Sequence, residues 1–344
     1  ARQRFVKAGL MYEDRELEEY LNAVAVKVLA DRLEGTRTAP RIKIVKDPFL
    51  NAFAMSDGII FFHTGLLARM ENEAQLATIL GHELAHFINR DAAKMSRNRQ
   101  DRFTAVKIMQ VVLAVSVIGV FADQLPTVWA ETSVKGYSKE LEARADEDGL
   151  RAMVQAGYDP QESVRIFELF KQDQDGSKFK EPFFYGTHPR IEERIANYIR
   201  LIKTRYPSAD GGAGRRRDSE EFPVRIQTVL LDNALLDLEI GRFKLARAAI
   251  ERHLERRPDS PRGHFVMGEF YRRSGRNDEA VKEYARAVAL DARQAEAHRE
   301  LGLLYRAQAR YDEARLEFER YLVLKPAAVD GPIIRGYIKD SGTP

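Results

Sequence analysis

Two histidines and a glutamate within five residues offer the clearest chemistry in this sequence. His82 and His86 are four residues apart, Glu83 lies between them, and the run 71–89 has apolar residues at helical spacing. Residues four apart share one face of a helix, so both imidazoles can bind one metal ion. Glu83 then lies next to the ion, where it can take a proton from water. The alternative is a pair of structural histidines on an ordinary helix.

A catalytic zinc ion needs a third protein ligand, and the chain has no cysteine to provide it. Glu142 and Asp146 are four residues apart in a helix predicted over 140–156. One carboxylate can bind the ion while the other orients a ligand histidine. The alternative interpretation of this segment is a solvated acidic helix. The histidines at 63, 253, 264 and 298 are expected to have structural or surface roles.

The elements that would position these residues are mostly helical, and the predicted class is mainly α with a small sheet (α+β). A helix is predicted over 12–33 because apolar residues recur there at helical spacing. Alternation of apolar and charged residues predicts a strand at Arg41–Val45. Two further apolar runs, Ala52–Met55 and Ile59–His63, predict a hairpin around Gly58.

One strongly apolar segment, 108–122, is shorter than the roughly 20 residues that a membrane-spanning helix needs. It fits a buried or interface-facing helix. It also fits a surface segment that touches lipid at the membrane periphery or covers a cleft.

Length and composition limit the number of domains and the class of protein. A chain of 344 residues has room for about two domains. The hydrophobic fraction of 44% excludes general disorder. Lys and Arg number 55 against 52 Asp and Glu, so no strong positive field indicates a nucleic-acid partner. The start at Ala1 is typical of a processed or trimmed chain, and no leader pattern follows it.

The C-terminal third repeats with a period of 34 residues. Gly268 and Gly302 have this spacing, as do Tyr284 and Phe318. This resembles the tetratricopeptide repeat, in which small residues lie where paired helices touch. We therefore predict three domains or segments: a catalytic domain over 1–206, a glycine-rich, charged linker over 207–223, and an α-solenoid of about three repeats over 224–344.

The motifs together resemble the gluzincin metallopeptidases that include HtpX and the CAAX prenyl proteases. The chain shares with them HELAH at 82–86 and EARAD at 142–146. Further similarity lies at Asn51, Ala52, Phe53 and Ala54, and in a third motif, Thr187-His188-Pro189 with Arg194. With the repeats attached, the chain is most similar to BepA-like periplasmic peptidases, although it lacks the multiple membrane spans of HtpX. A zincin-type domain is the fold that this resemblance implies.

The resemblance also implies roles for individual residues. His82, His86 and Glu142 would bind one Zn2+ per chain, Glu83 would be the general base, and Asp146 would support a ligand histidine. His188 would block the metal in a resting state or steady the tetrahedral intermediate; a turn residue is the alternative. Arg194 would stabilise the oxyanion or form a surface ion pair. Extended substrate would pair with the strand edge formed by Asn51, Ala52, Phe53 and Ala54.

The expected function is zinc-dependent endopeptidase activity on unfolded or misassembled envelope proteins. The repeats would bind the client or a partner such as an outer-membrane assembly complex. The resemblance alone implies the periplasmic location. A different class of function remains open at this point: a repeat-based chaperone or scaffold whose zinc site is structural or capped by His188.

Overall fold

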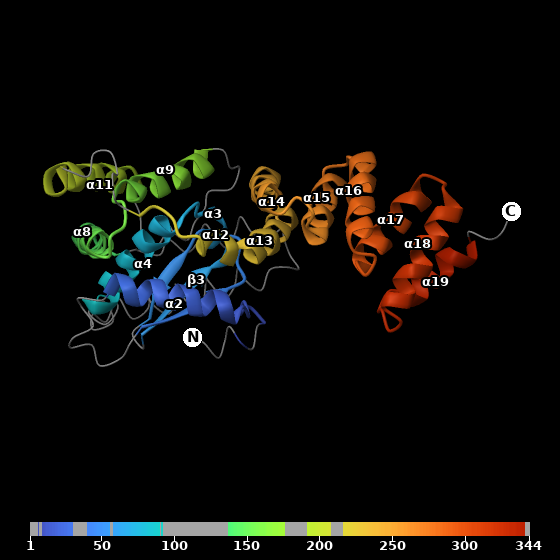
Figure 1. The fold of residues 1–344 in the computed structure, drawn as a ribbon, viewed down its shortest axis with the longest axis horizontal. Coiled ribbons are helices and arrows are strands. Elements are labelled where there is room, and N and C mark those ends of the chain that lie inside the picture. Colours follow the sequence, from blue (N-terminus) through green and yellow to red (C-terminus); the bar gives the residue numbers. More distant parts are fainter. Residues whose placement is uncertain are drawn as a thin grey trace. The chain divides into compact units, whose positions relative to one another are not determined.

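A computed structural model gives the fold, and two compact units divide the chain between Val229 and Leu230. The structure describes residues 6, 9–29, 40–55, 58–89, 91, 137–175, 191–207 and 216–340. Helices dominate both units, and a three-stranded sheet belongs to the first (Figure 1). The prediction of a mainly helical chain with a small sheet and C-terminal helical repeats is confirmed.

The first unit combines long helices with the sheet. Its elements are α2 (Arg15–Leu29), β1 (Arg41–Val45), β2 (Ala52–Ala54), β3 (Ile59–His63), α3 (Thr64–Arg69), α4 (Glu73–Ile88), α8 (Lys139–Gln155), α9 (Gln161–Asp175), α11 (Ile191–Arg205) and α12 (Phe222–Arg225).

The sheet has the order β1-β3-β2, so β3 is central. β2 runs antiparallel to β3 with Ala52 opposite Phe62, which confirms the predicted hairpin. β1 runs parallel to β3. All five residues of β3 are buried, because helices and both neighbouring strands cover this strand. Among the described strands β2 therefore lies at one edge of the sheet.

Helix α4 runs through the centre of the first unit. Its residues from Glu73 to His86 are all buried. Asn72 caps its start, where the side-chain oxygen accepts a hydrogen bond from the Gln75 amide at 3.0 Å. It packs against α2, α8 and α9 (Figure 1), and also against β2. Because α4 is enclosed on several sides, side chains on its final turns are held in a rigid environment.

The segment 216–219 is fixed to the first unit, so the prediction of a solvated linker is wrong there. The Arg217 carbonyl accepts a hydrogen bond from the Ala74 amide at 2.8 Å. The Arg216 carbonyl accepts from the Asp159 amide at 3.0 Å. Phe222, at the start of α12, is fully buried. These contacts join residues far apart in the chain, and the local composition gives no sign of them.

The second unit consists of paired helices. It includes most of α13 (Gln227–Glu239) and then α14 (Phe243–Arg256), α15 (Pro261–Arg273), α16 (Asn277–Leu290), α17 (Ala295–Ala307), α18 (Tyr311–Leu324) and α19 (Gly331–Asp340). A Cβ added to Gly268 would lie 2.5 Å from the Tyr284 ring, and one added to Gly302 would lie 2.5 Å from the Phe318 ring. The 34-residue spacing thus places a glycine under an aromatic ring in successive helix pairs.

None of the described helices combines the length and the hydropathy that crossing a membrane requires. The apolar segment 108–122 lies outside the described residues, and so does His188.

Candidate metal centre

Helices α4 and α8 meet at two glycines, and this contact brings the predicted metal ligands together. A Cβ added to Gly149 would lie 2.7 Å from the Gly81 carbonyl carbon and 2.7 Å from the His82 amide nitrogen. Only glycine allows the two backbones to approach this closely. Glu142 is two turns before Gly149 on α8, so it comes to lie beside His82 and His86.

The three predicted ligands converge on one point. The Nε2 atoms of His82 and His86 are 3.1 Å apart. One Glu142 oxygen lies 3.5 Å from His82 Nε2, and the other lies 3.4 Å from His86 Nε2. Ligands about 2.1 Å from a tetrahedral zinc ion are separated by roughly 3.4 Å, so this arrangement fits the ion. Among the described residues, no other group of three His, Asp or Glu side chains brings its donor atoms this close.

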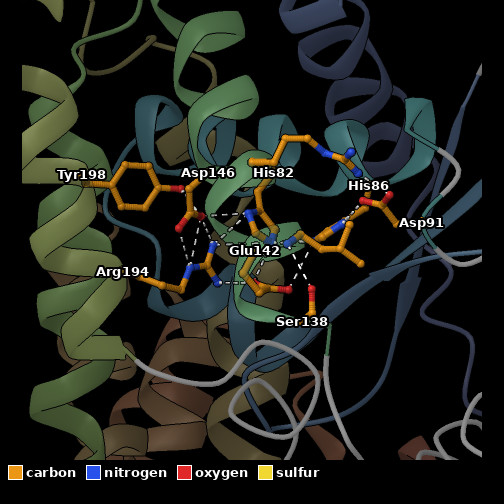
Figure 2. A network of polar contacts seen from close by, with 10 residues as sticks. His82, His86, Asp91, Ser138, Glu142, Asp146, Arg194 and Tyr198 are labelled. Atoms are coloured by element: carbon orange, nitrogen blue, oxygen red, sulfur yellow. Dashed lines mark hydrogen bonds and ion pairs between the residues drawn. The ribbon is translucent and has the colours of Figure 1, made fainter. Parts of the chain in front are cut away.

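A carboxylate backs each imidazole on the side away from this point. His82 Nδ1 lies 3.0 Å from Asp146 Oδ1, and His86 Nδ1 lies 2.9 Å from Asp91 Oδ2. Figure 2 shows Glu142 beside both histidines, Asp146 on the His82 side and Asp91 on the His86 side. A hydrogen bond from Nδ1 to a carboxylate leaves the Nε2 lone pair directed at the metal position.

The surroundings shift the pKa values of the two imidazoles in opposite directions. Burial lowers the pKa of His82 to about 3, with help from the Arg194 charge. Burial also opposes protonation of His86, but hydrogen bonds to Asp91 and Glu142 outweigh it and raise its pKa to about 9. His82 is therefore neutral near pH 7, whereas His86 holds a proton that a metal ion would displace.

Arg194 is buried against Asp146, so the surface ion pair considered for it is excluded. Its side chain is 3% exposed, and its Nη2 lies 2.5 Å from Asp146 Oδ1. The Tyr198 hydroxyl donates to the same oxygen at 2.8 Å. These contacts, together with packing of the guanidinium over the Phe167 ring at 4.3 Å, hold Asp146 in place behind His82. The negative charge of Asp146 compensates the positive charge of the buried Arg194 guanidinium.

Glu83 is 1% exposed and follows His82 on α4. Its charge is among the causes that raise the pKa of His86, after the hydrogen bonds to Asp91 and Glu142. Burial next to a cationic site suits a carboxylate that accepts a proton during a reaction.

Residues 51–54 lie at the sheet edge. The His63 amide donates to the Asn51 carbonyl at 3.0 Å, and the Met55 amide donates to the Ile59 carbonyl at 2.8 Å. Backbone groups alternate along a strand, so those of Ala52 and Ala54 point away from β3. β2 packs on the helix that carries the histidines.

The site contains side chains that the sequence analysis did not identify. Asp91 pairs with His86, and Arg144 Nη2 pairs with Asp91 Oδ1 at 2.5 Å. The Tyr137 ring stacks on His86 with centroids 4.0 Å apart. Gly81 and Gly149 provide the helix contact. A glycine inside a helix costs stability relative to alanine, so these two positions carried a signal of close packing.

Comparison with known proteins adds independent findings. A family model described as peptidase family M48 matches residues 13–201, and a tetratricopeptide repeat model matches residues 268–308. A β-barrel assembly-enhancing protease of Yersinia pestis is 26% identical over 57% of this chain and 41% of its own length. A putative β-barrel assembly-enhancing protease of Vibrio cholerae is 22% identical over 74% of this chain and 58% of its own length.

A third relative is the mitochondrial metalloendopeptidase OMA1 of Arabidopsis thaliana, which is 32% identical over 37% of this chain and 25% of its own length. The chain thus spans between a quarter and three fifths of the length of these three relatives.

Proposed function

This chain belongs to peptidase family M48, and we propose that it is a zinc-dependent endopeptidase. The observation that carries the proposal is the convergence of His82, His86 and Glu142, with donor atoms 3.1 to 3.5 Å apart. Two imidazoles and one carboxylate are a ligand set of catalytic zinc sites, which keep a position open for water or substrate.

The mechanism assigns Glu83 as the general base. When bound, Zn2+ supplies Lewis acidity that polarises a peptide carbonyl and lowers the pKa of water to about 7. Glu83 takes the proton from the attacking water and then donates it to the departing amine nitrogen as the C–N bond breaks. Asp146, held by Arg194 and Tyr198, keeps His82 oriented throughout.

The edge strand β2 provides a place for an extended substrate. The backbone groups of Ala52 and Ala54 point away from β3. Both residues are buried, so we propose that a peptide adds to the sheet there by main-chain hydrogen bonds in place of the groups that cover them. Such pairing is tolerant of side chains. We therefore infer that the enzyme cleaves extended segments of unfolded or misassembled proteins.

Two residues from the third motif keep their proposed roles. Arg194 Nη1 lies 3.7 Å from Glu142 Oε2, so we propose that its charge also helps to stabilise an oxyanion. His188 lies outside the described residues, and we propose that it caps the metal in a resting state or assists the reaction.

The relatives support an envelope function. Two of them carry names that refer to β-barrel assembly. We infer that this chain acts on envelope proteins in the periplasm, and that its repeats bind the client or an outer-membrane assembly complex. Helical repeats are suited to this because stacked helix pairs build extended peptide-binding surfaces.

The decisive experiment compares Glu83→Gln with wild type for zinc content and for cleavage of casein. Glu83→Gln is expected to retain one zinc ion and to lose roughly 10²–10⁴-fold in rate. Glu168→Gln is the matched control, because Glu168 is exposed on α9 and should leave both quantities unchanged. Wild-type cleavage should also stop on addition of a chelator and return with Zn2+.

Two results would contradict the proposal in different ways. Casein cleavage by Glu83→Gln at the wild-type rate would exclude Glu83 as the base. Bound zinc without cleavage, both in wild type and in His188→Ala, would favour a repeat-based chaperone or scaffold.

A further inference from the structure

Asp91 lies between a metal-binding histidine and an arginine from a different helix. Its carboxylate is fully buried, three residues beyond the end of α4. Oδ2 lies 2.9 Å from His86 Nδ1, and Oδ1 lies 2.5 Å from Arg144 Nη2. Each oxygen therefore has its own charged or polar donor, and the carboxylate joins the end of α4 to α8.

The same kind of chain supports the other histidine. Asp146 Oδ1 lies 3.0 Å from His82 Nδ1, and Arg194 pairs with Asp146. The two arginines differ in environment, because the Arg194 side chain is 3% exposed and that of Arg144 is 41% exposed. Each imidazole is thus backed by a buried carboxylate that is itself paired with an arginine.

The Asp91 contacts fix His86 in the orientation that metal binding requires. With Nδ1 bound to Asp91, Nε2 faces Glu142 Oε1 at 3.4 Å. Tyr137 stacks on the ring and limits its tilt. Arg144 is two residues after Glu142 on α8, so it also ties His86 to the helix that carries the third ligand. Displacement of α8 would therefore disturb two ligands together.

We propose that Asp91 and Arg144 are positioning residues that hold His86 in register with Glu142 and so set the affinity for the metal. This inference rests on the proposed metal site. Neither residue is proposed to contact the substrate or the reacting atoms. The positioning role requires both carboxylate oxygens of Asp91 to accept hydrogen bonds, one from His86 and one from Arg144. An asparagine at 91 offers one acceptor oxygen for the two donors from His86 and Arg144, so one contact must be lost.

The test is the equilibrium Zn2+ affinity of the full chain, measured by competition with a chromophoric chelator at fixed pH. Asp91→Asn is expected to weaken binding roughly 10- to 100-fold, the usual cost of losing a carboxylate that supports a ligand histidine. Arg144→Gln should weaken binding less, because Asp91 remains. The double variant should bind no more weakly than Asp91→Asn, since Arg144 acts through Asp91.

Asp148→Asn is the matched control. Asp148 also joins the two helices, because its Oδ2 accepts from Asn89 Nδ2 at 3.2 Å, and its Oδ1 pairs with Arg151 on α8. It should leave Zn2+ affinity unchanged. The spectrum of the Co2+-loaded protein gives a second readout, which should differ from wild type in Asp91→Asn and match it in Asp148→Asn.

The outcomes separate this inference from the proposed function. Absence of Zn2+ binding by wild type would reject the metal site itself. Tight wild-type binding with equal affinity in Asp91→Asn, or an equal loss in Asp148→Asn, would reject only the positioning role. Urea unfolding of each metal-free variant shows whether that variant folds. If Asp91→Asn does not fold, Arg144→Gln still tests the positioning role, because the Arg144 side chain is half-exposed and its replacement should not prevent folding.

Discussion

Substitution of Gly149 by alanine should separate the helices that build the metal centre. The added Cβ would lie 2.7 Å from two backbone atoms of α4, where ordinary contact begins at 3.4 Å. Backbone atoms in two packed helices cannot rotate away as a side chain does, so α8 must move by about 0.7 Å. Donor positions in a metal site tolerate about 0.2 Å, and the shift exceeds this limit.

Two energies of opposite sign decide the effect on stability. Overpacking costs about 1–3 kcal/mol, and replacing a helical glycine by alanine returns up to about 1 kcal/mol. We expect Gly149→Ala to lower the free energy of unfolding by up to about 2 kcal/mol. Because Glu142 moves with α8, Zn2+ affinity should fall at least about tenfold.

Urea unfolding and chelator competition measure these two quantities. Gly336→Ala is the control, because Gly336 lies within α19 and an added Cβ there meets nothing within 4 Å. It should leave Zn2+ affinity unchanged and raise the stability of the second unit slightly. A Gly149→Ala protein as stable as wild type, with unchanged Zn2+ affinity, would refute the argument from helix contact.

Three further predictions concern pH, the repeats and the metal. Burial opposes ionisation of Glu73, but hydroxyls of Ser219, Tyr158 and Tyr20 and the Lys27 ammonium hold its pKa below the ordinary value. The ionised Glu73 carboxylate thus stabilises the folded state above about pH 4.3, and this contribution is lost as the pH falls through the lowered pKa. When the urea midpoint is measured at decreasing pH from pH 6, it should therefore fall less for Glu73→Gln than for wild type. Gly268→Ala should lower the thermal midpoint of the second unit in calorimetry, because its Cβ would lie 2.5 Å from the Tyr284 ring, while Zn2+ affinity stays at the wild-type value. Removal of Zn2+ by a chelator should lower the thermal midpoint of the first unit and leave that of the second unchanged, since the ligands all lie in the first.

The proposed metal ligands could be predicted from the sequence because their spacing is local. His82 and His86 share a helix face through a four-residue interval, and Glu142 and Asp146 do so on a second helix. The repeats were accessible for a similar reason. A glycine and an aromatic residue recur every 34 positions, and each glycine lies under its ring.

Contacts between residues far apart in the chain could not be predicted from local spacing. Arg194 was considered for a surface ion pair, but it is buried, where it pairs with Asp146 and packs over the Phe167 ring. The segment 216–219 has the composition of a linker, and backbone hydrogen bonds to Ala74 and Asp159 nevertheless fix it. The amino-acid composition of a segment does not predict which distant backbone groups will form hydrogen bonds with it.

The sequence alone thus predicted which side chains bind a metal ion and determined where the helical repeats lie, because both depend on intervals within one helix or one repeat. Tertiary structure decided how the ligands meet. The contact between Gly81 and Gly149 sets the distance from Glu142 to the histidines, and the burial of Asp91 beside His86 sets the orientation of that ring. Both features depend on how two helices pack, and the periodicity of the sequence does not specify the distance between those helices.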